Sequence, residues 1–108
     1  MQAAIRDIYV DPTVADYIVR LVGATRIHPD VYLGASPRGS IALYRAGQAL
    51  AGLLGRDYVI PDDVKSLVVP VLAHRILVTA DAAMAGQTPA SLLADIMGQV
   101  PVPVRDRT

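Results

Sequence analysis

The most informative chemical group in the sequence is an arginine close to the start of an expected helix. In the stretch Gly34-Ala35-Ser36-Pro37-Arg38-Gly39, Ser36 is a residue type that caps helices and Pro37 favours the first helical position. Arg38 would then lie in the first turn, where the positive end of the helix dipole disfavours a cation by up to about 1 kcal/mol. A bound anion would reverse that sign, because helix N–H groups and a guanidinium both bind phosphate oxygens. Arg38 is therefore either part of a phosphate site or an arginine that extends into solvent.

Few other side chains have the types and spacing that catalysis requires. His28 and His74 are far apart in the chain and lack the spacing of a metal-binding motif, and there is no cysteine. Asp62 and Asp63 follow an expected helix start, where stabilisation of the helix explains them better than acid–base catalysis. No phosphate-binding loop of the G-x-x-x-x-G-K-[ST] type is present. We therefore expect no metal site, and no hydrolysis by this chain alone.

Composition and charge place the chain among ordinary globular domains. Of its 108 residues 53% are hydrophobic, and ten basic residues balance ten acidic ones. We therefore expect one folded domain over residues 1–108, ordered from about 9 to 103, with a polar tail at 104–108. No predicted helix carries the cluster of cations that a nucleic-acid reader needs. The longest apolar stretch is too short to span a membrane, and the lack of cysteines and of a signal peptide predicts a cytoplasmic location.

Four prolines stand at positions that favour helix starts, and they predict four helices. The predicted helices cover, in order, residues 12–26, 37–54, 61–69 and 89–100. Ser36 and Thr88 precede two of these prolines and predict side-chain caps. Pro70 should kink or end the third helix near Val69, because proline cannot donate the backbone hydrogen bond of a helix interior.

The core must be built from small and aliphatic side chains, since the chain contains no Phe and no Trp. We expect the second helix to be central, with an apolar face made of Leu43, Ala46, Gly47, Leu50, Leu53 and Leu54. Residues 27–34 are predicted to be a connector, and the β-branched residues of 76–79 favour a brief extended piece. The predicted fold class is all-α, a bundle of about four helices with at most a very short strand pair near 76–78.

Four short blocks occur in a characteristic order along the chain. They are Tyr17-Ile18-x-x-Leu21-Val22-x-Ala24-Thr25-Arg26, Leu33-Gly34-Ala35-Ser36-Pro37-Arg38, Gly55-Arg56-Asp57-Tyr58-Val59-Ile60-Pro61-Asp62-Asp63-Val64 and Leu72-Ala73-His74-Arg75. Together they resemble the C-terminal lid subdomain of the MoxR family of AAA+ ATPases, over most of the chain from about residue 9 to 103. The resemblance implies a small helical bundle that packs over an ATP held by a larger α/β core domain.

The resemblance also implies roles for individual residues. Arg38 matches the family's sensor-2 arginine, a catalytic residue that would reach the γ-phosphate of ATP and compensate charge during phosphoryl transfer. Ser36 and Pro37 would form the helix start that orients this arginine. Tyr17 is expected either to line the adenine side of the nucleotide or to pack in the core. ATP and Mg²⁺ would be bound mainly by the core domain, which this sequence does not contain.

Ile60 stands where relatives usually carry a threonine, so the third helix lacks a side-chain cap, at a cost of about 1 kcal/mol. Arg26 belongs either to a subunit interface or to a solvated surface, and the roles of His74 and Arg75 are not assigned. The resemblance implies a parent ATPase, from which the chain was cut or of which it is a remnant, and we favour the first. The implied partners are the core domain, neighbouring subunits of a ring and a client protein for chaperone-like remodelling or metal insertion. The alternative is a non-enzymatic helical module that binds another protein.

Overall fold

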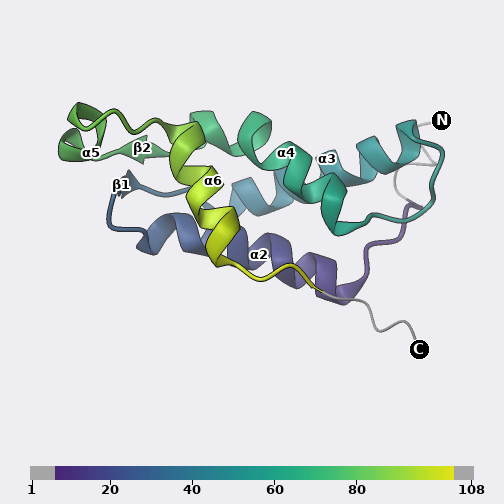
Figure 1. The fold of residues 1–108 in the computed structure, drawn as a ribbon. Coiled ribbons are helices and arrows are strands. Elements are labelled where there is room, and N and C mark those ends of the chain that lie inside the picture. Colours follow the sequence, from purple (N-terminus) through teal and green to yellow (C-terminus); the bar gives the residue numbers. More distant parts are fainter. Residues whose placement is uncertain (1–6, 104–108) are drawn as a thin grey trace.

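The computed structural model describes residues 7–103, which form a small helical bundle with one short antiparallel strand pair (Figure 1). The elements are α2 (Pro12–Ile27), β1 (Val31–Leu33), α3 (Pro37–Leu53), α4 (Pro61–Leu72), the 3-10 helix η1 (Ala73–Arg75), β2 (Leu77–Val78), α5 (Ala80–Met84) and α6 (Pro89–Gln99). The predicted fold class, a helical bundle with a very short strand pair, is confirmed. The tail predicted at 104–108 lies outside the described residues.

The four helices predicted from prolines begin at those prolines, and three of them carry a side-chain cap. Asp11, Ser36 and Thr88 each accept a hydrogen bond from a backbone N–H in the first turn of α2, α3 and α6. Ile60 provides no such cap for α4, as predicted. These starts depend on residues within one helical turn of each other, and for this reason the sequence predicts them well.

Helix α3 ends at a glycine with a left-handed backbone. Gly55 has φ +82°, a conformation that residues with a Cβ rarely adopt. Its N–H donates to the carbonyl of Gly52 at 3.1 Å, and the N–H of Arg56 donates to the carbonyl of Ala51 at 2.9 Å. This pair of bonds is the Schellman arrangement, which satisfies the last carbonyls of a helix and turns the chain away.

The core lies between α2, α3 and α4, and α6 lies across α2 and α4 (Figure 1). Its largest fully buried side chains are aliphatic apart from Tyr17. Gly39 lets α3 approach α4 closely, since a Cβ there would lie 3.2 Å from Leu72 Cδ2. The lack of a side chain at Gly39 therefore permits the close packing of these two helices.

The predicted apolar face of α3 is partly wrong. Its buried residues are Gly39, Leu43, Gly47 and Ala51, which follow each other at steps of four, whereas Leu53 and Leu54 are 83% and 61% exposed. The helix ends here, so these two leucines lie beyond the surface that α2 and α4 cover.

Helix α4 does not end near Val69 but continues through Pro70 to Leu72. The carbonyl that loses its partner to a proline belongs to the residue four positions earlier, here Ser66. Ser66 and Pro70 are both exposed, so water can satisfy that carbonyl. Burial of Leu72 on the opposite face keeps the last turn helical.

Strand β1 and helix α5 were not predicted from the sequence. Strand β1 lies in the predicted connector and pairs with β2, with Val31 opposite Val78 and Leu33 opposite Leu77. The N–H of Thr79 extends the pairing by donating to the carbonyl of Asp30 at 2.9 Å. This pairing joins the segment that leads into α3 to the segment that follows α4.

Among residues 7–103, no helix combines the length and the apolar character that crossing a bilayer requires.

Candidate functional site at the start of helix α3

Arg38 is an exposed residue in the first turn of α3, as the sequence predicts. The ion pairs found among residues 7–103 are made by Arg20, His28 and Arg56, and the guanidinium of Arg38 takes part in none of them. The N–H groups of this guanidinium also donate no hydrogen bond within the described part of the chain. The side chain thus presents a complete set of donors to whatever binds on this surface.

The backbone donors of the same turn are already used. Pro37 has no N–H, the N–H of Arg38 donates to Ser36 Oγ at 3.2 Å, and the N–H of Gly39 donates to the Ser36 carbonyl at 2.8 Å. The expectation that free N–H groups at this helix start bind an anion is therefore corrected, because these donors already bind Ser36. An anion here would be bound by the guanidinium of Arg38, while Ser36 and Pro37 shape the turn that carries it.

The backbone of Ala35, three residues before Arg38, is held from both sides by the end of α2. Thr25 Oγ1 accepts a hydrogen bond from the Ala35 N–H at 2.9 Å and donates to the Val22 carbonyl at 2.6 Å. Arg26 Nε donates to the Ala35 carbonyl at 2.9 Å. Thr25 and Ala35 are completely buried. From the sequence, Arg26 could belong either to a subunit interface or to a solvated surface. In the structure its Nε has a hydrogen-bond partner within the chain.

Gly34 brings the chain into direct contact with the end of α2. A Cβ at this position would lie 2.7 Å from both Arg26 Cα and the Thr25 carbonyl oxygen, distances at which backbone atoms must shift. Only glycine fits this approach. The blocks that contain Thr25 and Gly34, separate in the sequence, form one structural unit.

A second arginine lies beside the first turn of α3. Arg75 Cδ lies 3.9 Å from the point that a Cβ of Gly39 would occupy. Arg75 and its neighbour His74 are exposed, and neither makes an ion pair among residues 7–103. The structure thus brings the last of the four sequence blocks next to Gly39, the residue that follows Arg38.

Tyr17 belongs to the core and not to the exposed surface that carries Arg38. Its side chain is 1% exposed and packs in the main apolar cluster. Its hydroxyl is buried and has no hydrogen-bond partner among the described residues. Burial, together with the charge of Asp62, raises the pKa of the Tyr17 hydroxyl. This position favours the core-packing interpretation of Tyr17 over the adenine-lining one.

The neighbouring carboxylates Asp62 and Asp63 have different surroundings. Asp62 is exposed, whereas Asp63 is buried and ion-paired with Arg56. Asp63 also accepts a hydrogen bond from the Ile60 N–H at 2.9 Å. Asp63 thus serves the start of α4, in agreement with the interpretation that placed these residues at a helix start.

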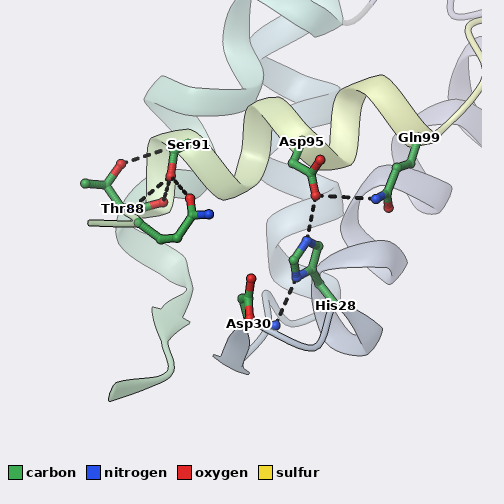
Figure 2. Close-up of polar contacts among 7 residues, drawn as sticks. His28, Asp30, Thr88, Ser91, Asp95 and Gln99 are labelled. Atoms are coloured by element: carbon green, nitrogen blue, oxygen red, sulfur yellow. Dashed lines mark hydrogen bonds and ion pairs between the residues drawn. The ribbon is translucent and has the colours of Figure 1, made fainter. Parts of the chain in front are cut away.

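His28 joins α6 to the end of α2, a contact that the sequence analysis missed (Figure 2). Its Nδ1 accepts from the Asp30 N–H at 3.0 Å, so in the neutral ring Nε2 carries the proton and donates to Asp95 Oδ2 at 2.8 Å. The side chain of His28 is 7% exposed. Within residues 7–103, His and Asp side chains form no group of three that could hold a metal ion.

Comparison with known proteins agrees with this geometry. A family profile described as AAA lid domain matches residues 23–96. The chain is 44% identical over 105 residues to the uncharacterized protein YeaC of Bacillus subtilis, covering 97% of the chain and 33% of that protein. It is 36% identical over 104 residues to Chaperone MoxR1 of Mycobacterium tuberculosis, covering 88% of the chain and 28% of that protein.

A solved structure has the same fold. The crystal structure of a candidate ATPase from Cytophaga hutchinsonii superposes with a TM-score of 0.90 at 28% sequence identity, covering 95% of this chain and 34% of that one. The chain thus spans about a third of the length of the relatives it matches. From the profile match, the relatives and the shared fold, we conclude that the chain belongs to the AAA lid domain family and is a lid region of the MoxR type of AAA+ ATPases.

Proposed function

We propose that the chain acts as the lid of an AAA+ ATPase and supplies Arg38 as the sensor-2 residue to ATP held by a separate core domain. The observation that carries the proposal is the exposed guanidinium of Arg38, which has no partner among residues 7–103 and extends from a turn whose backbone donors are satisfied. A guanidinium offers a planar fork of donors that matches phosphate oxygens. Placed against the γ-phosphate, it would compensate the charge that moves during phosphoryl transfer.

The remaining nucleotide contacts would come mainly from the core domain. The chain lacks a phosphate-binding loop, so the core would hold ATP and its Mg²⁺, and the isolated lid would bind nucleotide weakly. Ser36 and Pro37 would contribute by forming the helix start next to the phosphate. The buried position of Tyr17 gives it a structural part in this arrangement.

The lid would convert the state of the nucleotide into movement. Hydrolysis and phosphate release remove the counter-charge of Arg38, which would change the preferred orientation of lid and core. The name Chaperone MoxR1 of one relative supports chaperone-like remodelling of a client protein as the outcome, with metal-cofactor insertion as a second form of it. The proposal includes a ring of neighbouring subunits and a cytoplasmic location.

A groove between α2 and α3 supports the alternative, a non-enzymatic module that binds another protein. The groove is lined by Ala15, Ile18, Val19, Ser40, Ile41, Tyr44, Arg45 and Gln48. Val19 and Ile41 are 59% and 57% exposed, so the groove offers apolar surface to a partner. Titration of the chain with the core domain and a nonhydrolysable ATP analogue, followed by NMR, distinguishes the two functions. Shifts centred on residues 36–39 favour the lid, and shifts confined to the groove favour the module.

The decisive experiment is Arg38→Ala in the complete ATPase that contains this chain. We expect kcat for ATP hydrolysis to fall by about 100-fold or more, with an unchanged unfolding temperature, because the exposed side chain makes no hydrogen bond or ion pair within residues 7–103. Arg45→Ala is the matched control, since Arg45 is also exposed on α3 and unpaired within the described residues. Unchanged turnover of the Arg38→Ala protein would refute the proposal.

A further inference from the structure

We infer that Thr25 and Arg26, at the end of α2, are positioning residues for Arg38. Both side chains bind the backbone of Ala35, and through it they fix the position in space of the first turn of α3 and of Arg38. The inference rests on the proposed role of Arg38, and its tests are chosen so that the two can fail separately.

Thr25 provides the buried half of this arrangement. Its hydroxyl donates to the Val22 carbonyl in the preceding turn of α2, which leaves the oxygen lone pairs directed to the Ala35 N–H. Because Thr25 and Ala35 are completely buried, water cannot replace this bond. Removal of the hydroxyl would leave the Ala35 N–H without a partner, and the loop would have to move to satisfy it.

Arg26 provides the second half through one atom of its side chain. Its Nε donates to the Ala35 carbonyl at 2.9 Å, while the residue as a whole remains exposed. The N–H and the C=O of Ala35 are therefore both held by consecutive residues of α2. The two bonds hold the two peptide units on either side of the Ala35 Cα, so they restrict the backbone dihedral angles of this residue as well as its position.

Only Ser36 and Pro37 separate Ala35, the residue held by Thr25 and Arg26, from Arg38. Ser36 follows Ala35 directly, and its Oγ accepts from the N–H of Arg38 at 3.2 Å. Gly34 on the other side packs against the backbone of Arg26 without room for a Cβ. A displacement of Ala35 is therefore passed to the first turn of α3, and a shift of about 1 Å at a catalytic group can cost about 100-fold in rate.

The Thr25 test uses two variants in the complete ATPase. Thr25→Val removes the hydroxyl at nearly constant shape, and Thr25→Ser keeps it. We expect Thr25→Val to lower kcat by about 10-fold or more and Thr25→Ser to stay within about 2-fold of the wild type. Ser66→Ala is the matched control, since Ser66 Oγ makes the same kind of bond to a carbonyl three residues earlier, on α4. It should leave kcat unchanged.

The Arg26 test separates the hydrogen bond from the charge. In glutamine the side-chain amide nitrogen occupies the place of arginine Nε, so Arg26→Gln keeps the donor to Ala35, whereas Arg26→Met keeps length without a donor. We expect Arg26→Met to lower kcat and Arg26→Gln to retain it within about 2-fold. Equal losses in both variants would show that the charge acts on another molecule, and would overturn the assignment for Arg26.

Two readouts distinguish positioning from simple loss of fold. Arg38 would contact the γ-phosphate, which ADP lacks, so a displaced Arg38 should weaken the binding of ATP but not that of ADP. We therefore expect Thr25→Val to lower the affinity for ATP and to leave the affinity for ADP unchanged. In a double-mutant cycle, Thr25→Val should have little further effect on kcat once Arg38 is alanine, because Thr25 acts through Arg38. A full additional loss in that background would overturn the inference.

The outcomes separate this inference from the proposed function. If Arg38→Ala is strongly impaired while Thr25→Val and Arg26→Met both turn over normally, the positioning role is wrong and the sensor role stands. If Arg38→Ala itself is fully active, the sensor role is wrong and the positioning role falls with it. If the Thr25→Val protein does not fold, the Arg26→Met and Arg26→Gln proteins test the inference instead, because Arg26 is exposed.

Discussion

Arg56 and Asp63 form a two-armed ion pair that joins the end of α3 to the start of α4. Arg56 Nη1 and Nη2 donate to the two carboxylate oxygens of Asp63 at 2.8 and 2.7 Å. Asp63 also accepts from the N–H of Ile60, which cannot cap α4 with its own side chain. One carboxylate thus replaces a missing cap and holds a turn between two helices.

This pair predicts a loss of stability in acid. Burial acts to raise the pKa of the Asp63 carboxyl, but hydrogen bonds from Arg56 and from the Ile60 N–H outweigh it and lower the pKa overall. The stabilisation is therefore complete above the ordinary carboxyl pKa of about 4 and is lost as the pH falls through the lowered value. Asp63→Asn should lower the free energy of unfolding at pH 7 by about 1–3 kcal/mol. Urea denaturation from pH 2 to 7 measures both effects, and a variant with the same acid dependence as the wild type would contradict this assignment.

Gly34→Ala should destabilise the chain by about 1–3 kcal/mol, because the new Cβ would overlap backbone atoms of Thr25 and Arg26. Gly23→Ala is the matched control on α2, where a Cβ meets no atom within 4 Å. This control should raise stability by up to about 1 kcal/mol through helix propensity. Thermal unfolding of the two proteins should give opposite shifts, and shifts in the same direction would count against the close approach at Gly34.

Ser36→Asp keeps a helix cap at this position and adds a negative charge beside Arg38. Aspartate caps helices as well as serine, so the free energy of unfolding should stay within about 0.5 kcal/mol of the wild type. The added carboxylate lies next to Arg38 and would compete with phosphate for the guanidinium. We expect ATP hydrolysis by the complete ATPase to fall while stability is kept. Ser36→Thr should retain both properties, and full activity of Ser36→Asp would show that Arg38 meets no anion.

The contact between His28 and Asp95 should contribute about 1–2 kcal/mol to stability, because the bond links α6 to a histidine side chain that is largely buried. Asp95→Ala removes the acceptor, whereas Asp95→Asn keeps a carbonyl oxygen for Nε2. Chemical denaturation should therefore show a loss for alanine and a smaller one for asparagine. Gln99→Ala, which removes only the 3.3 Å bond from Gln99 to Asp95, is the control. Equal stability of Asp95→Ala and the control would mean that the histidine bond contributes nothing.

Tyr17→Phe should leave stability unchanged or raise it by up to about 1 kcal/mol, since the hydroxyl is buried without a partner among the described residues. Tyr17→Ala should instead cost about 3–5 kcal/mol through the cavity it leaves. The KM for ATP of the complete ATPase should be the same with Tyr17→Phe. A raised KM at unchanged stability would restore the adenine-lining role.

Local rules explain what could be predicted from the sequence. The four helix starts and the caps at Ser36 and Thr88 depend on residues within a few positions of each other. The position of Arg38 in the first turn of α3 follows from the same rules. The absence of a cap at Ile60 could also be predicted, but the carboxylate that replaces it could not, because its burial depends on the α3–α4 packing.

Tertiary structure alone decided the contacts between residues distant in the chain. The bond from Arg26 to Ala35 spans nine positions and that from His28 to Asp95 spans 67, and neither follows from helix periodicity. The continuation of α4 past Pro70 depended on which side of the helix faced solvent. The amino-acid sequence by itself determined where helices begin and which cationic residue lies in the first turn of α3, since these depend on backbone hydrogen bonds within one turn. Packing determined how that cation is held and which carboxylates are buried, since these depend on surfaces that meet only in the folded chain.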